Sequence, residues 1–225
     1  MLQSITSKSW WPYVAPFGIF LLLLGASAWL PGGARWHYPV RVLASAAALM
    51  IWSRPLMRLK ISNWTGSCFL GVLVFAVWVL PDSLWPAWRT HWLFVNAFTA
   101  APAEPPGAEL RGDWFFLFFR IFGSALLVPV IEELFWRGWL MRYLISKNFQ
   151  QVPLGAYAPA SFWLTALLFA SEHGTFWDVG LAAGILYNWW LVRTRSLADC
   201  MAAHAVTNGC LAAYVLAGGH WRYWF

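Results

Sequence analysis

Charged residues are scarce in this chain. Only 11% of its 225 residues are charged, whereas a typical soluble domain has about 25%. Hydrophobic residues make up 60% of the sequence. This balance excludes an ordinary soluble globular domain and indicates a membrane protein.

Cysteine and metal-binding motifs are also sparse. The sequence has no CxxC or HExxH motif, and its three cysteines, Cys68, Cys200 and Cys210, all lie within apolar runs. We therefore expect buried packing cysteines rather than disulfides or metal ligands, and no cofactor. The net charge of +6 does not indicate a nucleic-acid partner, because the basic residues lie between apolar runs instead of forming a patch.

Long apolar runs fill most of the chain, and each is close to the roughly 20 residues of a membrane-spanning helix. We predict an all-α membrane helical bundle with about seven transmembrane helices (six to eight), forming one integral membrane domain over residues 1–225. Tryptophans at the run ends fit aromatic belts at the two membrane interfaces. The runs are Trp10–Leu30, Val40–Trp52 (extendable to Leu59), Trp64–Leu80, Trp114–Ile131, Ala158–Ala170, Phe176–Val192 and Leu197–Ala217.

Two segments leave alternatives open. The first apolar run follows Lys8 and ends near "GASA", a pattern also typical of a signal peptide, although a retained first helix is commoner in such a chain. The segment Pro81–Asp113 contains the helix breaker "PAEPPG" and the apolar stretch "LWPAWRTHWLFVNAF". We expect residues 84–99 to be interfacial or re-entrant, and a span there would change the orientation upstream.

The basic residues between the runs predict an orientation through the positive-inside rule. They place the N-terminus in the cytoplasm and the C-terminus outside, and we expect the inner (plasma) membrane of a bacterium. The predicted cytoplasmic set is Lys8, Arg54, Arg58, Lys60, Arg137, Arg142, Lys147, Arg193 and Arg195, and the outer set is Arg35, Arg41, Arg89, Arg111 and Arg222.

Ionisable residues inside apolar runs are costly, at least ~2.5–3.5 kcal/mol near a helix centre, so they usually face the protein interior. The stretch "VIEELFWRGW" places Glu133 and Arg137 one turn apart, where they can pair. Glu132 is rotated by about 100° from Glu133. One carboxylate can therefore be held by the arginine while the other points elsewhere, and the spacing alone does not decide which is a base.

Two further polar clusters interrupt the apolar runs. "FASEHG" places His173 one turn after Phe169, and "HAVTN" places His204 and Asn208 on one helix face. Counting the rise along each helix gives overlapping depths for the three clusters, so we expect them to meet in one polar pocket. Each cluster also has a purely structural explanation: a solvated Glu–Arg pair at a helix end, a capped interfacial histidine, or polar contacts that join helices.

The chemistry of these groups favours amide hydrolysis. A carboxylate and a histidine that share a water form a general base. A histidine and an asparagine on one helix face can donate hydrogen bonds to a developing oxyanion. Together they supply what hydrolysis needs without a nucleophilic serine or cysteine.

In this order, "EELFWR", "FASEH" and "HAVTN" fit the motifs EExxxR, FxxxH and HxxxN. The sequence thereby resembles the CPBP (CAAX prenyl protease / bacteriocin-processing) family of intramembrane proteases, which includes the type II CAAX prenyl endopeptidases. The resemblance covers roughly residues 113–217, which we expect to form the catalytic core.

The resemblance implies a glutamate-dependent endopeptidase that cuts a protein or peptide substrate in the bilayer near its C-terminus, a prenylated CAAX end being the family's best-known target. By motif position, Glu132 and His173 would activate the water. His204 and Asn208 would form the oxyanion site, and the supporting residues would be Glu133, Arg137 and Phe169.

Other functions remain open. Glu132, His173 and His204 could instead bind Zn²⁺ for metal-dependent hydrolysis. Intramembrane acids and histidines also mark proton relays in transporters, although the polar clusters here all lie in the second half of the chain and paired halves are not evident. A non-catalytic membrane scaffold is a third possibility.

A small-residue motif adds an expectation about packing. "GLAAG" at Gly180–Gly184 has the small-xxx-small spacing that lets helix backbones approach closely. We predict that this face of the sixth helix contacts a neighbouring helix.

Overall fold

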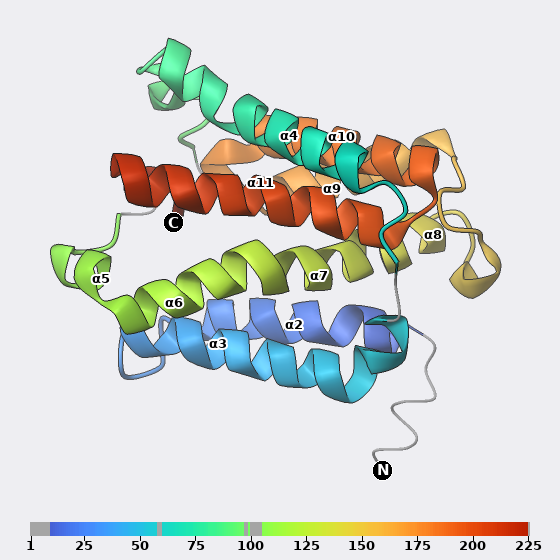
Figure 1. The fold of residues 1–225 in the computed structure, drawn as a ribbon, viewed down its shortest axis with the longest axis horizontal. Helices are drawn as coiled ribbons and strands as arrows, with labels where there is room; N and C mark the ends of the chain where they lie inside the picture. The colour runs from blue at the N-terminus through green and yellow to red at the C-terminus, as the bar shows by residue number, and fades with distance from the viewer. Residues whose placement is uncertain (1–9, 58–59, 97–98, 100–104, 225) are drawn as a thin grey trace.

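A computed structural model describes residues 10–57, 60–96, 99 and 105–224. Every regular element in this part of the chain is helical, which confirms the predicted all-α class. Figure 1 shows the long helices lying along one axis of the molecule. The α-helices are α2 (Trp11–Ala26), α3 (Ala34–Ala48), α4 (Trp64–Leu84), α5 (Ala108–Gly112), α6 (Trp114–Phe122), α7 (Val128–Glu133), α8 (Met141–Tyr143), α9 (Pro159–Ser171), α10 (Trp177–Thr194) and α11 (Leu197–Gly218).

Four continuous helical stretches are long and apolar enough to cross a membrane: Ala34–Met57, Trp64–Leu84, Trp114–Tyr143 and Leu197–Gly218. Two shorter helices, α2 and α9, are also apolar. The number of seven spans stays a prediction. The second span begins at Ala34 rather than at Val40, because the more polar segment "ARWHYP" before Val40 forms the first turns of α3.

The segment after α4 is not a spanning helix in its described part. α4 continues through Pro81 to Leu84, four residues beyond the expected end. The chain then turns, forms the short 3-10 helix η3 (Trp88–Thr90), and lies against the start of α10, where Trp177 Nε1–H donates to the carbonyl of Leu93 at 3.0 Å. The breaker's residues 102–104 lie outside the described residues.

The apolar run Trp114–Ile131 is the first part of a continuous helical stretch of 30 residues, Trp114–Tyr143. Two wide π-helical segments, η4 (Gly123–Leu127) and η5 (Leu134–Leu140), flank α7 within it. The amide of Val128 bonds to the carbonyl of Gly123, five residues back. Pro129 has no N–H to continue an ordinary ladder. π-helical turns are often found at functional sites. The short helix α7 between the two π-helical segments is therefore a candidate location for a functional site.

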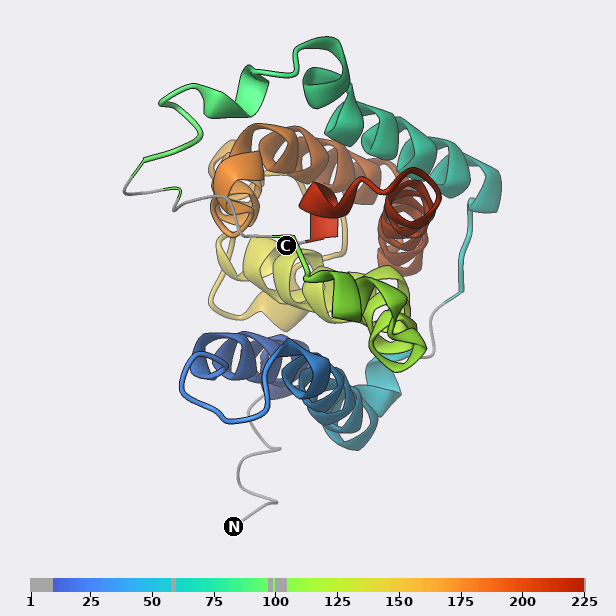
Figure 2. The same cartoon turned by 90° about the vertical axis from the view of Figure 1, so that its left-hand side faces the viewer.

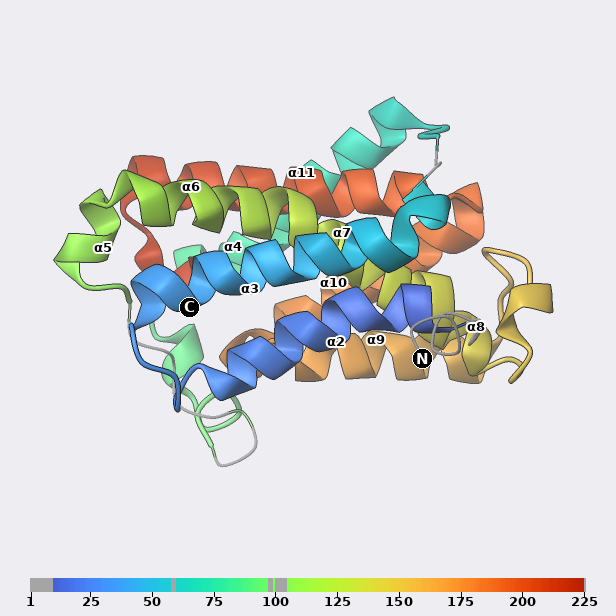
Figure 3. The same ribbon diagram turned by 90° about the horizontal axis from the view of Figure 1, so that it is seen from below.

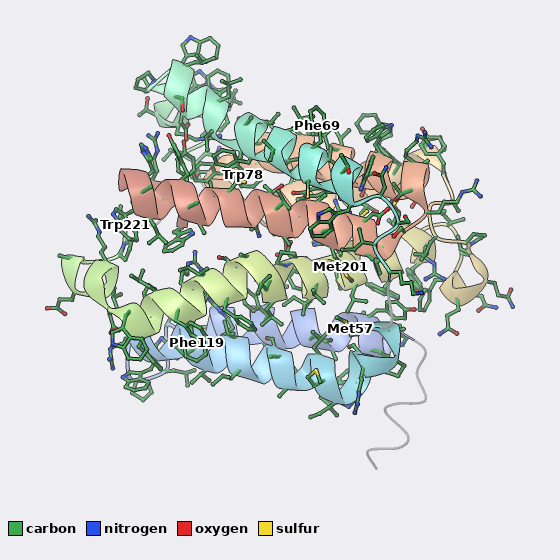
Figure 4. The ribbon with its side chains drawn as sticks, in the orientation of Figure 1. Met57, Phe69, Trp78, Phe119, Met201 and Trp221 are labelled. Carbon is green, nitrogen blue, oxygen red and sulfur yellow. The ribbon has the colours of Figure 1, made fainter. Side chains whose placement is uncertain are left out.

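α11 is packed between several other helices. It makes its most extensive contact with α4, and it also contacts α7 and α10. α2 and α3 lie side by side against the long helix (Figure 3). A Cβ added at Gly71 of α4 would stand 2.5 Å from the carbonyl oxygen of Ala203, so the two backbones touch there. On the outer face of α4, Phe69 points away from the bundle and is 71% exposed (Figure 4).

The predicted small-residue contact of α10 is confirmed. A Cβ at Gly184 would stand 3.2 Å from the backbone of Ala166 on α9, and one at Gly180 would stand 3.1 Å from the ring of His173. The cysteines correspond only in part to the expectation, because Cys200 is buried whereas Cys68 and Cys210 are half-buried.

Gly184→Leu is expected to lower the thermal stability of the purified protein by the equivalent of about 1–3 kcal/mol, because the added side chain must push α9 away. Gly209→Leu is the matched control, since a Cβ there meets nothing within 4 Å. Thermal unfolding of both variants in the same detergent measures the difference. Equal midpoints for the two variants would show that the α9–α10 contact does not limit stability.

The two ends of the bundle carry different loops (Figure 1). We call the end where α2 begins the N-terminal end and the end where α11 finishes the C-terminal end. One residue of the predicted cytoplasmic set was assigned wrongly, because Arg137 is fully buried inside the bundle rather than in a loop. Lys8 and Arg58 of that set lie outside the described residues. The orientation itself stays a prediction.

Candidate active site

Four side chains singled out in the sequence line one cavity of about 160 Å³. Glu132 comes from α7, His173 from the turn after α9, and His204 and Asn208 from α11. The three motifs therefore meet in space, as their estimated depths predict. The cavity wall continues from this group toward the C-terminal end of the bundle.

Glu133 and Arg137 form the predicted pair one helical turn apart. Arg137 Nη1–H donates to Glu133 Oε1 at 3.1 Å, and neither side chain has any exposed surface. Arg137 also donates to Asn188 Oδ1 at 2.9 Å and to the carbonyl of Gly184 at 3.3 Å. Its guanidinium lies 4.5 Å from the ring centre of Phe169. This buried charge is thus held by hydrogen bonds and aromatic faces on several helices.

His204 binds the same carboxylate oxygen, a contact that the sequence did not predict. Its Nδ1 lies 2.9 Å from Glu133 Oε1, and its ring stacks on Tyr187 at 5.0 Å between centres. With Nδ1–H donating to the carboxylate, a neutral His204 can only accept at Nε2. To donate to an oxyanion, as its motif position implies, His204 must carry a proton on both ring nitrogens.

Glu132 is placed differently from its neighbour. It lines the cavity, its side chain is mostly buried, and none of the described residues donates a hydrogen bond to its Oε2. Glu133, in contrast, is tied to Arg137 and His204 and does not line the cavity. The geometry therefore favours Glu132 as the carboxylate available for chemistry, a choice that the spacing alone left open.

His173 is held in one tautomer by the backbone. Its Nδ1 lies 2.7 Å from the carbonyl oxygen of Phe169, so Nδ1 carries the proton and Nε2 keeps the lone pair in the neutral ring. The ring lies between those of Phe169 at 4.7 Å and Trp78 at 5.2 Å. A histidine fixed in this way can accept a proton at Nε2.

Asn208 reaches across to the long helix. Its Nδ2–H donates to the carbonyl of Ser124 at 2.8 Å, within the π-helical segment η4. The amide group has a second N–H. One N–H therefore fixes the side chain while the other can serve a ligand in the cavity.

Several lining residues were missed by the sequence analysis. Arg120 could have been found, because it is an ionisable residue inside an apolar run. Asn188, a polar residue inside another run, does not line the cavity but accepts a hydrogen bond from Arg137. Glu172, next to His173 in the chain, does not line the cavity either; its Oε1 accepts a hydrogen bond from Trp136 Nε1 at 3.1 Å. The other unpredicted lining residues include Trp78, Ser124, Tyr187, Thr207, Tyr223 and Trp224.

The zinc alternative finds little geometric support. Among the described residues, no three or more His, Cys, Asp or Glu side chains are grouped so that they could hold a metal ion. The imidazole of His204 is instead turned toward Glu133 and its arginine partner.

The comparisons with known proteins bear on the same region. Residues 114–210 match the family described as Rce1-like, type II CAAX prenyl endopeptidase Rce1-like. This confirms the resemblance seen in the motifs, and the matched segment contains all four cavity residues named above. No significant match to a curated protein or to a solved structure was found.

Proposed function

Since residues 114–210 match the Rce1-like family of type II CAAX prenyl endopeptidases, a family of proteases, we propose that this chain is an intramembrane endopeptidase. It hydrolyses a peptide bond near the C-terminus of a membrane-associated protein, for which a CAAX-like end is the type of substrate suggested by the family. The observation that carries the proposal is the placement of Glu132 in the cavity beside His173, with Glu133 withdrawn into an ion pair.

The proposed reaction uses a water held between Glu132 and His173 Nε2. Glu132 accepts a proton from this water as its oxygen attacks the scissile carbonyl carbon. The second N–H of Asn208 and the imidazolium of His204 stabilise the resulting oxyanion. The proton then passes to the leaving amine, the C–N bond breaks, and the carboxylate is restored.

The test is cleavage of a membrane-embedded reporter peptide by the purified protein, with the new ends identified by mass spectrometry. A chelator series on the same preparation separates the glutamate mechanism from the zinc alternative: full activity after chelation supports the former. Absence of cleavage for CAAX-like and unmodified reporters alike would contradict an endopeptidase and favour a transport or scaffold role.

Asn208→Ala is expected to slow cleavage by about 10²–10³-fold, the usual effect of losing one oxyanion donor. The change should act on kcat more than on KM, because the lost hydrogen bond strengthens only in the transition state. Steady-state kinetics with the reporter measure it. Asn148→Ala, in an exposed loop, is the control. A rise in KM at constant kcat would assign Asn208 to substrate binding instead.

The orientation has a direct consequence for the substrate. We propose a cytoplasmic N-terminal end, so Lys147→Cys in a cysteine-free background should react with an impermeant maleimide only after permeabilisation. Arg111→Cys should react in intact cells. The cavity extends toward the C-terminal end, so this orientation favours a substrate segment outside the cytoplasm. The reverse labelling pattern would place the cavity on the cytoplasmic side.

A further inference from the structure

The segment after α11 folds back into the bundle. Gly219 adopts φ +68°, the left-handed conformation that suits glycine, and the chain reverses into the 3-10 helix η8 (Trp221–Trp224). Figure 2 shows η8 in the middle of the ring of helices at the C-terminal end. Tyr223 and Trp224 are 8% and 2% exposed, and both line the same cavity as Glu132. Burial raises the pKa of the Tyr223 phenol to about 12, so this lining group is uncharged at neutral pH.

Arg120 holds this segment by its main chain. Arg120 Nη2–H donates to the carbonyl oxygen of Trp224, and the guanidinium lies 5.7 Å from the Trp224 ring centre. It also lies 4.7 Å from the ring centre of Tyr38. A guanidinium that binds a main-chain oxygen can bind a peptide of another sequence in the same way. Because it is charged, it prefers a carboxylate to a carbonyl.

Arg120 and Glu132 lie on the same side of the long helix. The cavity is lined by residues 120, 124, 128 and 132, which are spaced by four and form one stripe. Twelve residues at 1.5 Å each separate the two ends of the stripe by about 18 Å. Because both side chains are long and line the same cavity, a few residues of extended chain at ~3.3 Å each are enough to join them.

We propose that Arg120 anchors the C-terminal carboxylate of the substrate at the end of the cavity away from Glu132, and that Trp221–Trp224 occupies this subsite until a substrate displaces it. The proposal rests on the proposed endopeptidase function for the identity of the ligand. It makes the chain's own segment an internal competitor, and it makes Arg120 a specificity residue for short C-terminal peptides.

The remaining contacts of η8 with the bundle can be replaced by contacts with a bound peptide. Arg222 lies 4.0 Å from Asp82, with almost half of its side chain exposed, and Asp82 also pairs with Arg89 at 3.1 Å. The Tyr223 ring contacts Phe176 at 5.6 Å between centres. Because the Arg222 side chain is almost half exposed, solvent screens its pair with the buried Asp82, which keeps Arg89 as a second partner when Arg222 leaves. A tethered segment nevertheless competes strongly with free peptide because its effective concentration is high.

The probe for this proposal is a fluorescein-labelled peptide with the sequence HWRYW, residues 220–224, and a free carboxylate. Its binding to the protein in nanodiscs is followed by fluorescence anisotropy. Trp224→Ala, which loosens the internal competitor, should bind the probe at least tenfold more tightly than the unaltered protein. Adding Arg120→Gln should remove this gain, whereas adding Arg193→Gln, an exposed arginine near the opposite end, should keep it.

The end group of the probe provides a second measurement. A carboxamide end should weaken binding to Trp224→Ala several-fold, and this difference should vanish when Arg120→Gln is added. Arg120→Lys, which keeps the charge, should recover part of it. Unchanged probe affinity in Trp224→Ala, or the same affinity with and without Arg120→Gln, would overturn the proposal. Thermal unfolding confirms that each variant is folded.

Binding of the probe requires no turnover, so the two proposals can fail separately. If the probe binds as expected but no reporter is cut, the endopeptidase function is wrong and the peptide subsite remains. If reporters are cut but Arg120→Gln changes neither their KM nor the probe affinity, the function stands and the anchoring role of Arg120 is wrong.

Discussion

Glu132→Gln is expected to reduce cleavage of a membrane-embedded reporter to less than about one-thousandth of the unaltered rate, the range of loss for a positioned general base. Glutamine keeps the size of the side chain and its hydrogen-bonding capacity, but it cannot accept the proton of the attacking water. Glu132 lines the cavity, and among the described residues no hydrogen-bond donor contacts its Oε2. The fold should therefore tolerate the change.

The measurement compares kcat/KM and the thermal midpoint of each purified variant. Glu109→Gln, an exposed acid on α5, is the control for loss of a carboxylate elsewhere. His173→Ala should resemble Glu132→Gln, and the double variant should be little worse than either, because groups that act on one water behave as a unit. A Glu132→Gln protein that cleaves at the normal rate would rule out the glutamate mechanism.

The sequence predicted those features that depend on local spacing. The first part of the 30-residue helix followed from the apolar run Trp114–Ile131, and the Glu133–Arg137 pair followed from the helical repeat. The meeting of the three motifs followed from rise per residue, because helices that cross one membrane share a depth scale. Helix length, the spacing of one turn and the depth along a helix depend on residue order alone. They can therefore be predicted without knowing which helices are neighbours.

Features that depend on contacts between distant segments could not be predicted. His204 and Glu133 are 71 residues apart in the chain, and no spacing rule joins them. The π-turns around α7 arise from the hydrogen-bond ladder and leave no clear mark on apolar periodicity. The sequence "WRYW" resembles an aromatic membrane-interface anchor, whereas the fold places Trp224 inside the cavity.

Glu133→Gln is expected to act chiefly on stability. It removes the negative charge that, within the described part of the chain, forms the ion pair with Arg137, a side chain with no exposed surface. Breaking a buried pair from one side costs about 3–5 kcal/mol because the remaining charge stays uncompensated. The hydrogen bonds of Arg137 to Asn188 and to Gly184 persist, so we expect the lower part of this range. For a chain of this size, about 3 kcal/mol lowers the unfolding midpoint by roughly 6–12 °C.

A double-mutant cycle separates the ion pair from other effects of the substitution. Arg137→Met removes the stranded charge and fills a similar volume, so Glu133→Gln combined with Arg137→Met should be less destabilised than the sum of the two single variants. Cleavage by folded Glu133→Gln should be reduced through misplacement of His204, yet stay well above that of Glu132→Gln. Additive losses of stability would show that Glu133 and Arg137 do not stabilise the fold as a pair. A normal midpoint with cleavage fully lost would instead make Glu133 the catalytic base.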